Sequence, residues 1–353
     1  MNGFWIQTGI ITITTTSLVG LMTFPDEGGE VVLRNHVSAL YDSNILGRES
    51  KESDVLLSYK PTLEFTRDSG IVAMDAEIGG DFGFFTDNSD LNYEDFTSRL
   101  GLKFPNDEDY PYQAKLSGSH EEISDLDRFL GERLESNYTA IDAELRYDFT
   151  ERWAIGLALG WSETSYQRSV VNPESRRFFD LSSWQAGGRF IYNYSDNLDW
   201  SVGYTYTESD AQVSAKNHAW VLNVNGQLSP KVQGSLGIGY NRYESTLGDF
   251  SDPHFSADLT WQATDEFAVK LGVRTDYRTT ATGEPVRARS ADLRLEYSLK
   301  GYWLAAVGIG YEDFRFEGGD LTRTDDLWFA SASFQRILSP FTSLKLGVRY
   351  EDQ

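Results

Sequence analysis

The stretch Trp153-Ala-Ile-Gly-Leu-Ala-Leu-Gly-Trp161 decides the fold class, because its side chains separate into two kinds at every second position. The residues between the large ones are all alanine or glycine. A β-strand directs alternate side chains to opposite faces. One face is therefore an apolar band with an indole at each end, and the other face is nearly bare. The large apolar residues are Trp153, Ile155, Leu157, Leu159 and Trp161.

A soluble sheet would bury this band in a protein core, whereas a transmembrane β-barrel turns it towards lipid between two aromatic girdles. The rest of the chain favours the barrel. The alternation recurs over residues 31–350 in about seventeen segments of roughly ten residues, the length that a tilted barrel strand requires. The sequence therefore predicts an all-β protein, a transmembrane antiparallel up-and-down β-barrel of about 18 strands.

The connections between these segments alternate in length. Short turns such as 67–70, 195–197 and 339–340 use the Gly, Pro, Asn and Asp chemistry of tight hairpins. Outer-membrane barrels have short periplasmic turns and long external loops, so this alternation predicts a bacterial outer-membrane location. The longer polar loops are expected near residues 42–54, 86–93, 119–137, 163–177, 207–216, 244–253, 279–287 and 312–324.

The predicted number of strands, about seventeen, is odd, which indicates that one strand has not been identified. The first and the last of the seventeen segments both lead away from a short turn, whereas bacterial barrels usually have an even count with both ends periplasmic. We expect the chain to be a fragment that lacks its closing C-terminal strand; the alternative is that residues 4–17 supply it. Residues 1–24 are otherwise expected to be a signal peptide or N-terminal extension, and residues 25–353 the outer-membrane β-barrel.

Composition narrows the function classes. The 353 residues include only 9 Pro and show no linker-like tract, which favours one large domain. The formal charge of −23 argues against nucleic-acid binding, which requires a basic surface. It also argues against electrostatic attachment to anionic lipid. Cysteine is absent, and no residue pattern calls for a cofactor.

The face opposite the apolar band carries many charges of both signs, which a dry core would not tolerate unpaired. A barrel of 16–18 strands leaves an aqueous channel, so we expect a wet lumen. These side chains form either a solvated lining with cross-strand ion pairs or, in part, a selectivity constriction. The pore-lining candidates are Lys60, Glu64, Asp75, Glu77, Arg99, Asp142, Glu144, Arg146, Arg189, Lys270, Arg274, Asp292, Arg294 and Glu296.

Aromatic residues close the apolar face at both ends of many segments, as girdles at the membrane–water interfaces do. The girdle candidates are Trp153, Trp161, Trp184, Trp200, Tyr204, Tyr240, Trp261, Trp303 and Tyr311.

Catalytic and metal-binding patterns are missing from the sequence. None of the four histidines lies in an H-E-x-x-H arrangement, and no G-x-S-x-G occurs, so we expect no enzyme. No loop has the D-x-[DN]-x-[DN]-G calcium pattern, and no metal site is predicted. The acidic loops are expected to form a solubilising outer rim; the alternative is that divalent cations bridge them to lipopolysaccharide.

One segment gives a family resemblance. Val37-Ser-Ala-Leu-Tyr-Asp-Ser-Asn-Ile-Leu46, and within it Tyr41-Asp42-Ser43-Asn44, resembles the opening segment of the β-barrel porin 2 family. Strand endings such as Gly239-Tyr-Asn-Arg-Tyr243 are similar in style, and the resemblance covers about residues 31–353. It implies an outer-membrane barrel associated with exopolysaccharide production and export. It brings no catalytic residues with it.

Three functions follow as hypotheses. The first is a water-filled porin-like channel for exopolysaccharide export or secretion. Its partners would be outer-membrane lipid and lipopolysaccharide, with polysaccharide and export-system proteins in addition. The second is a general small-solute uptake porin, which the scarcity of inward-facing aromatics favours. The third is a non-porous structural or surface-binding barrel, plugged by the loops 119–137 and 163–177.

Overall fold

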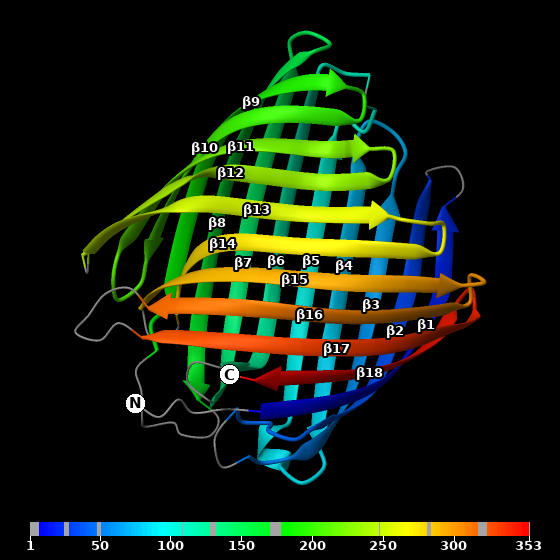
Figure 1. The fold of residues 1–353 in the computed structure, drawn as a ribbon. Coiled ribbons are helices and arrows are strands. Elements are labelled where there is room, and N and C mark those ends of the chain that lie inside the picture. The colour runs from blue at the N-terminus through cyan, green and yellow to red at the C-terminus, as the bar shows by residue number, and fades with distance from the viewer. Residues whose placement is uncertain are drawn as a thin grey trace.

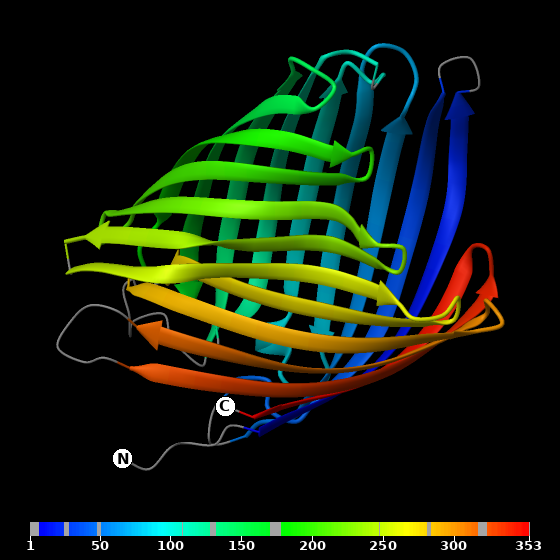
Figure 2. The same ribbon diagram turned by 45° about the horizontal axis from the view of Figure 1, so that its top comes forward.

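The computed structural model describes residues 7–24, 28–47, 51–107, 109–127, 132–169, 178–246, 248–280, 284–316 and 323–352. Within these residues the chain forms eighteen β-strands and one short 3-10 turn, Ser89–Leu91. Figures 1 and 2 show that the strands curve round into one barrel, so the predicted fold class is confirmed. No helix in the described part of the chain is long and apolar enough to span a membrane.

The strands are long and follow one another with little intervening chain. Their bounds are β1 Gln7–Phe24, β2 Gly29–Asp42, β3 Asp54–Arg67, β4 Ala73–Phe85, β5 Tyr93–Phe104, β6 Tyr112–Asp127, β7 Glu132–Asp148, β8 Trp153–Ser169, β9 Leu181–Ser195, β10 Leu198–Asp210, β11 Ala215–Ser229, β12 Val232–Ser245, β13 Gly248–Gln262, β14 Phe267–Thr279, β15 Pro285–Leu299, β16 Trp303–Phe316, β17 Thr324–Ser339 and β18 Thr342–Asp352.

The barrel is closed by its first strand. Each strand pairs antiparallel with its neighbours in the sequence, and β1 pairs with β2 on one side and with β18 on the other. The pairing of β1 with β18 runs from Gln7↔Asp352 to Ser17↔Thr342. The expectation that the closing strand is missing from the C-terminus is therefore wrong, and the alternative, an N-terminal closing strand, is what the structure shows.

The sequence of β1 explains why it can serve as a strand. Ile11 and Ile13 alternate with threonines, and β-branched residues favour the pleated, half-buried surface of a sheet. The side chain of Ile13 is exposed on the outer face and that of Thr14 is buried. Whether residues 1–24 are also a signal peptide is a question of processing, and it stays a prediction.

Closure by β1 also decides where the described chain ends lie. Gln7 is paired with Asp352, and Asp352 ends the strand that leads away from the short turn after β17. Both ends therefore lie at the end of the barrel that carries the longer connections, as Figure 1 shows for N and C. The sequence led us to expect both ends on the short-turn side. That expectation placed the eighteenth strand after residue 350, whereas the structure has it before residue 31.

The connections 42–54 and 86–93 lie where the sequence predicts them, whereas several others are shorter than predicted because the strands continue into them. β6 and β7 cover all of the expected loop 119–137 except residues 128–131, which lie outside the described residues. β13 begins at Gly248, inside the expected loop 244–253. β8 extends through residue 169, and the rest of the expected loop 163–177 lies outside the described residues. Polar strand ends look like loop in a sequence, because they lie beyond the apolar band that marks the membrane.

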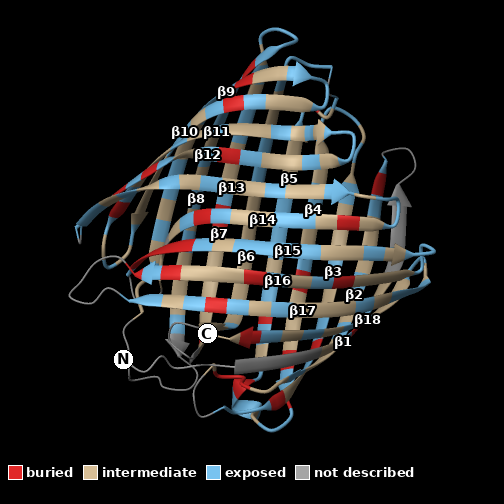
Figure 3. Cartoon of the chain, in the orientation of Figure 1, coloured by how far each residue is buried: buried red, intermediate tan, exposed pale blue. Residues whose placement is uncertain are grey.

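Over the described residues, the apolar band of the outer face is exposed. Ile155, Leu157, Val202 and Ile238 are 40%, 52%, 62% and 56% exposed, respectively. A soluble β protein would pack these side chains against other parts of its own chain. Figure 3 shows exposed and intermediate positions alternating along the strands, with buried ones scattered among them. The apolar band therefore faces outward all along the wall.

One seam in the wall is looser than the others. β13 and β14 pair only from Ser256↔Arg274 to Gln262↔Ala268, although β13 continues beside β12 as far as Gly248. On the N-terminal side of Ser256, β13 no longer pairs with β14, and Figure 2 shows β13 passing in front of the end of β14. Pro253 lies in this unpaired stretch, as expected for proline at a sheet edge.

Candidate functional site

The candidate site is the lumen, and the strand register identifies the side chains that face it. Lys60, Glu77 and Arg99 line one cavity together with Leu327 of β17 and Glu351 of β18, strands from another part of the ring. Side chains that meet in this way lie on the concave side of the barrel. Because cross-strand partners share a face, the pairing then assigns inward positions on every strand.

All fourteen pore-lining candidates fall on this inward face by register. Glu64 is paired with Glu77 and Glu77 with Arg99, and Lys270 is paired with Arg294. Asp142 and Arg146 follow the inward alternation of β7. Gly156 of β8 is the register partner of both Arg146 and Arg189, so Arg189 faces inward as well. The structure does not bring them into one cluster. They are spread over two charged stretches of wall, β2–β7 and β13–β15, with Arg189 alone between them.

Most inward-facing cations on the charged stretches are already paired. Arg34 donates to Glu64 with 2.7 Å between Nε and Oε1, and the Arg99 Nη2–Glu121 Oε1 distance is also 2.7 Å. Glu296 is contacted by both Lys270, at 3.0 Å, and Arg294, at 2.8 Å. Further inward pairs are Lys60–Asp81, Arg146–Asp148 and Arg349–Glu351.

These ion pairs are half-exposed to the lumen, where each contributes about 0–1 kcal/mol to stability. Their main consequence is electrostatic. The paired cations neutralise part of the wall. On β2–β7 the inward carboxylates outnumber the inward cations, whereas on β13–β15 the two signs are nearly balanced. The inward face therefore carries cross-strand ion pairs, and its charge is uneven around the ring.

Between the charged stretches lies a wall that we call the neutral wall, defined as the inward-facing positions of β8–β12. Small or amide side chains occupy it, and in its middle Arg189 is the one ionised side chain among the described residues. Asp199 lies on the same face at the short-turn end. Representative members are Gly156, Gly160, Gln185, Gly203, Thr205 and Asn223.

At the long-loop end the mouth is partly covered from inside. The segment 44–47 turns into the barrel, and Asn44 and Ile45 are 0% and 3% exposed. Ile45 and Leu46 form a buried cluster with Phe85 and Leu91, with Tyr93 packed against it. This inward segment was not predicted from the sequence. The feature of the sequence that could have indicated it is the apolar pair Ile45–Leu46 within a polar loop.

The extended hairpin of β6 and β7 completes the cover. β5 and β6 stop pairing at Thr97↔Glu121, and beyond this point the hairpin leans over the lumen. The carboxylate of Asp95 accepts hydrogen bonds from the backbone N–H and the hydroxyl of Ser124, at 2.9 and 2.7 Å. The guanidinium of Arg133 lies 5.0 Å from the ring centroid of Phe85 and 5.5 Å from that of Tyr93.

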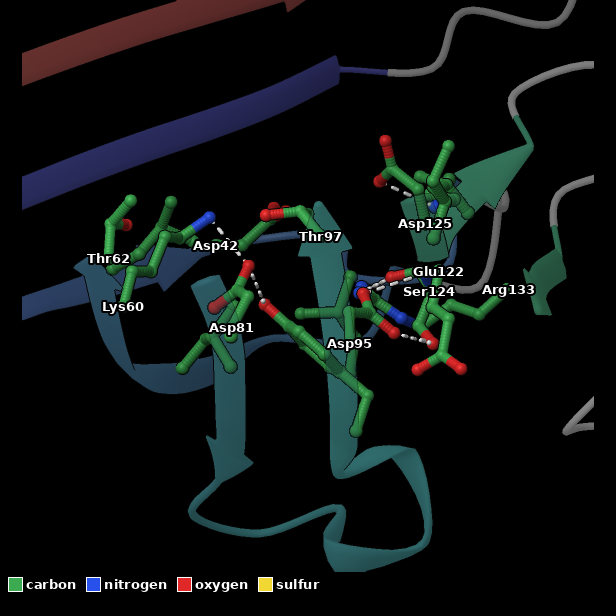
Figure 4. A pocket seen from close by; sticks show the side chains of 18 of the residues that line it. Asp42, Lys60, Thr62, Asp81, Asp95, Thr97, Glu122, Ser124, Asp125 and Arg133 are labelled. Carbon is green, nitrogen blue, oxygen red and sulfur yellow. Dashed lines mark hydrogen bonds and ion pairs between the residues drawn. The ribbon is translucent and has the colours of Figure 1, made fainter. Parts of the chain in front are cut away.

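These elements enclose a cavity of about 590 Å³ at the mouth, drawn in Figure 4. Figure 4 shows Lys60 directed at Asp81 and Asp95 directed at Ser124 across the cavity wall. Of the two loops expected to plug the barrel, the stretch 119–137 contributes residues to this cover. The other loop is in part outside the described residues. The cavity is lined by the carboxylates of Asp42, Glu77, Asp81, Asp95, Glu122, Asp125 and Glu351 and by the cations Lys60, Arg99 and Arg133.

One carboxylate organises the neighbouring loop. Asp54, at the long-loop end of β3 and outside the apolar band, is 3% exposed. It accepts hydrogen bonds from the Thr86 hydroxyl at 2.6 Å and from the Asn88 backbone N–H at 2.9 Å. Burial acts to raise the pKa of Asp54, but the bonds donated by Thr86 and Asn88 outweigh it and lower the pKa to about 2.

The nine girdle candidates lie on the outward alternation. Seven of them have between 36% and 48% of their surface exposed, whereas Trp303 and Tyr311 are half-buried. Neighbouring rings contact one another along the wall. The ring centroids of Trp153 and Tyr192 are 4.6 Å apart, and those of Tyr311 and Trp328 are also 4.6 Å apart.

The four histidines have ordinary polar partners. His36 contacts the hydroxyl of Thr16, His120 that of Thr139, and His218 that of Tyr204. His254 contacts the amide of Asn241. Across the described ranges, no group of three or more His, Cys, Asp or Glu side chains could hold a metal ion.

Comparison with known proteins gives a family. The family described as "Putative beta-barrel porin 2" matches residues 34–353. No curated protein matches the sequence.

Solved barrels are similar in outline. The siderophore receptor PirA from Pseudomonas aeruginosa is 8% identical over 98% of this chain and 80% of its own, with a TM-score of 0.48. The FrpB iron transporter from Neisseria meningitidis is 8% identical over 99% and 82%, with a TM-score of 0.47. OccK9 from Pseudomonas aeruginosa is 11% identical over 100% and 99%, with a TM-score of 0.44. The family match covers most of the chain, and the protein therefore belongs to the beta-barrel porin 2 family.

Proposed function

We propose that this protein is an outer-membrane channel with a water-filled lumen. The observation that carries the proposal is the division of the closed wall into an apolar outer face and an ionised inner face. Ion pairs such as Arg34–Glu64 are half-exposed on the inside and need water there, because an unsolvated interior would penalise the charges that remain unpaired. A non-enzymatic transport role fits this architecture.

For the cargo we propose a polysaccharide chain in export or secretion. The neutral wall supports this, because its hydroxyl and amide groups, such as those of Thr205, Gln185 and Asn223, are suited to hydrogen bonds with sugar hydroxyls. The segment Tyr41–Asn44, which resembles the family's opening segment, supports it as well. In the structure Tyr41 and Asp42 end β2, with Tyr41 exposed on the outer face, and Asn44 follows at the mouth, where it is fully buried.

A general pore for small solutes is the second candidate, and one observation favours it. Aromatic rings that would guide a sugar chain are scarce on the inward face at mid-height, where the neutral wall has alanine, glycine, serine and threonine. The outer face would contact outer-membrane lipid, with the acidic loops next to lipopolysaccharide. Polysaccharide and export-system proteins are the further partners that we propose.

Planar-bilayer recording tests the channel. Folded full-length protein should give discrete conductance steps, and heat-denatured protein at the same concentration should give none. Absence of conductance from protein that still shows heat-modifiable migration on a gel would contradict the open channel. It would favour a barrel that the mouth cover keeps closed.

Cargo is tested in proteoliposomes. Swelling rates with neutral oligosaccharides of increasing length should fall only slowly with length if an extended sugar chain is the cargo. A sharp cut-off at disaccharide size would favour the small-solute pore instead.

A further inference from the structure

Arg189 differs from most other cations of the lumen in its location as well as in its lack of a carboxylate partner. Arg274 of β14 is also exposed and forms no ion pair among the described residues, but it lies on a charged stretch of wall. Arg189 lies in the middle of β9 on the neutral wall, it is exposed, and no described residue forms an ion pair or hydrogen bond with it. By contrast, Arg34, Arg99 and Arg294 each hold a carboxylate at 2.7 or 2.8 Å. Arg189 therefore offers an unoccupied guanidinium to whatever passes through the lumen.

The strands beside Arg189 leave room for its side chain to lie along the wall. Its partners in the register are Gly156 on β8 and Gly203 on β10. A Cβ added at Gly156 would lie 2.7 Å from the Arg189 Nε atom, and one at Gly203 would lie 3.4 Å from the Arg189 Cβ. A larger residue at Gly156 would force the guanidinium to move. Glycine here allows the side chain to lie flat, with its donors still open to solvent.

The acidic excess elsewhere in the lumen does not cancel this charge. On the β10 side, the next charged stretch begins at β13, four strand spacings or about 19 Å away. This exceeds the Debye length of about 10 Å at 0.1 M salt. On the other side, Arg146 is joined to the same glycine, Gly156, and its own charge is balanced by Asp148 at 2.8 Å. On this side Glu144 of β7 is joined to β9 through Ala158, two strand spacings or about 10 Å away. An anion held by Arg189 therefore lies about one Debye length from the nearest inward carboxylates of β7.

We propose that Arg189 is a binding point for a carboxylate carried by a saccharide in transit along the neutral wall. The guanidinium fork matches a carboxylate in bidentate geometry. The hydroxyl and amide groups of Thr205 and Gln185 on the same wall suit the sugar hydroxyls beside that carboxylate. The proposal rests on the proposed channel function and specifies its substrate class as an acidic saccharide.

Current block in planar bilayers tests this, with linear oligogalacturonate as the probe and a neutral malto-oligosaccharide of equal length as its comparison. Oligogalacturonate should block the wild-type channel at lower concentration than the neutral oligomer. Arg189→Gln should weaken the acidic block about tenfold, as expected for loss of a charge-assisted contact, and leave the neutral block unchanged. Arg189→Lys should retain part of it.

The matched control is Arg294→Gln, which removes one positive charge from the same lumen but from a side chain bound to Glu296. It should change the acidic block less than twofold. Equal effects of the two substitutions would mean that net lumen charge governs the block, and this would overturn the proposal. So would equal block by the acidic and neutral oligomers. Conductance without selective block would leave the channel standing, whereas no conductance would contradict the channel itself.

Discussion

At the scale of single residues, Asp54 shows how one buried carboxylate can order a loop. Five donors from residues 86–88 converge on it, and a sixth comes from Val55. A buried acceptor with so many partners stabilises the loop strongly, because each donor would otherwise lose its hydrogen bond to water. The loop 86–92 in turn supports Phe85 and Leu91, which pack under the inward segment at the mouth.

Asp54→Asn should loosen this loop and leave the barrel intact. The amide keeps one acceptor oxygen but loses the charge, and we expect a local loss of about 1–3 kcal/mol. Hydrogen exchange of the amides 86–88 should accelerate, while heat-modifiable migration on a gel stays as in the wild type. Unchanged exchange at these amides would contradict the role assigned to Asp54.

The same carboxylate gives this loop a pH dependence. Its pKa is about 3.9 in an unfolded chain and about 2 in the fold. Its stabilising effect is therefore complete above about pH 4 and is lost as the pH falls towards 2. Limited digestion by an acid protease should cut the wild-type loop increasingly over this range, whereas Asp54→Asn should be cut at a rate independent of it.

At the scale of elements, the seam between β13 and β14 replaces backbone pairing with side chains. Asp252 of β13 contacts Arg287 and Arg289 of β15, the latter at 3.3 Å, and accepts a hydrogen bond of 3.0 Å from the Tyr277 hydroxyl. Arg287 is 8% exposed. The rings of Phe250 and Tyr277 pack beside this contact in a tilted arrangement, with their centroids 5.5 Å apart. The polar cluster therefore holds the β12–β13 hairpin against the wall where the ladder has ended.

Asp252→Asn should release the upper part of this hairpin. Removing one partner of a buried ion pair costs about 3–5 kcal/mol, and Asp252→Asn takes the carboxylate away from both Arg287 and Arg289. Exchange of the amides 248–255 should increase, and the pairing below Ser256 should stay protected. The control is Glu244→Gln, which breaks an exposed pair with Arg242 and should change stability by less than about 1 kcal/mol. Similar effects of the two substitutions would contradict the seam's dependence on Asp252.

At the scale of the whole molecule, the closed ring depends on β1. Its partner on the far side, β18, would otherwise expose an unpaired edge, which in a membrane is strongly unfavourable. Thr15 and Leu344 are register partners across this closure. Antiparallel partners have Cα atoms about 4.5–5.5 Å apart, within reach of a disulfide.

Thr15→Cys combined with Leu344→Cys should therefore cross-link in the folded full-length chain, which has no cysteine of its own. Oxidation should give a species that migrates faster on a denaturing gel and reverts on reduction. Thr15→Cys combined with Val202→Cys, on the distant strand β10, should give none. If the first pair of cysteines does not cross-link in protein whose heat-modifiable migration shows that it is folded, closure by β1 is contradicted.

The barrel itself could be predicted from the sequence, because the period-two alternation is a local property. Trp153 and Trp161 mark the ends of the apolar band without reference to any other strand. The lumen candidates follow from the same parity, and the register places all fourteen inward. Several loops, such as 244–253, were predicted too long, since strand ends such as Gly248–Ser251 are polar and carry no apolar alternation.

Other features depend on which strands pair with each other, and no local sequence pattern predicts that pairing. The alternation of Ile and Thr in β1 is compatible with a strand, but only pairing with both β2 and β18 makes it the closure. The inward turn of Ile45 is favourable because Phe85 and Leu91 come from other hairpins to cover it.

The sequence by itself determined the strands and the two faces of the wall, since side-chain alternation acts residue by residue. Tertiary structure alone decided the closing strand, the covered mouth and the isolation of Arg189. Each of these depends on distances between segments that are far apart along the chain.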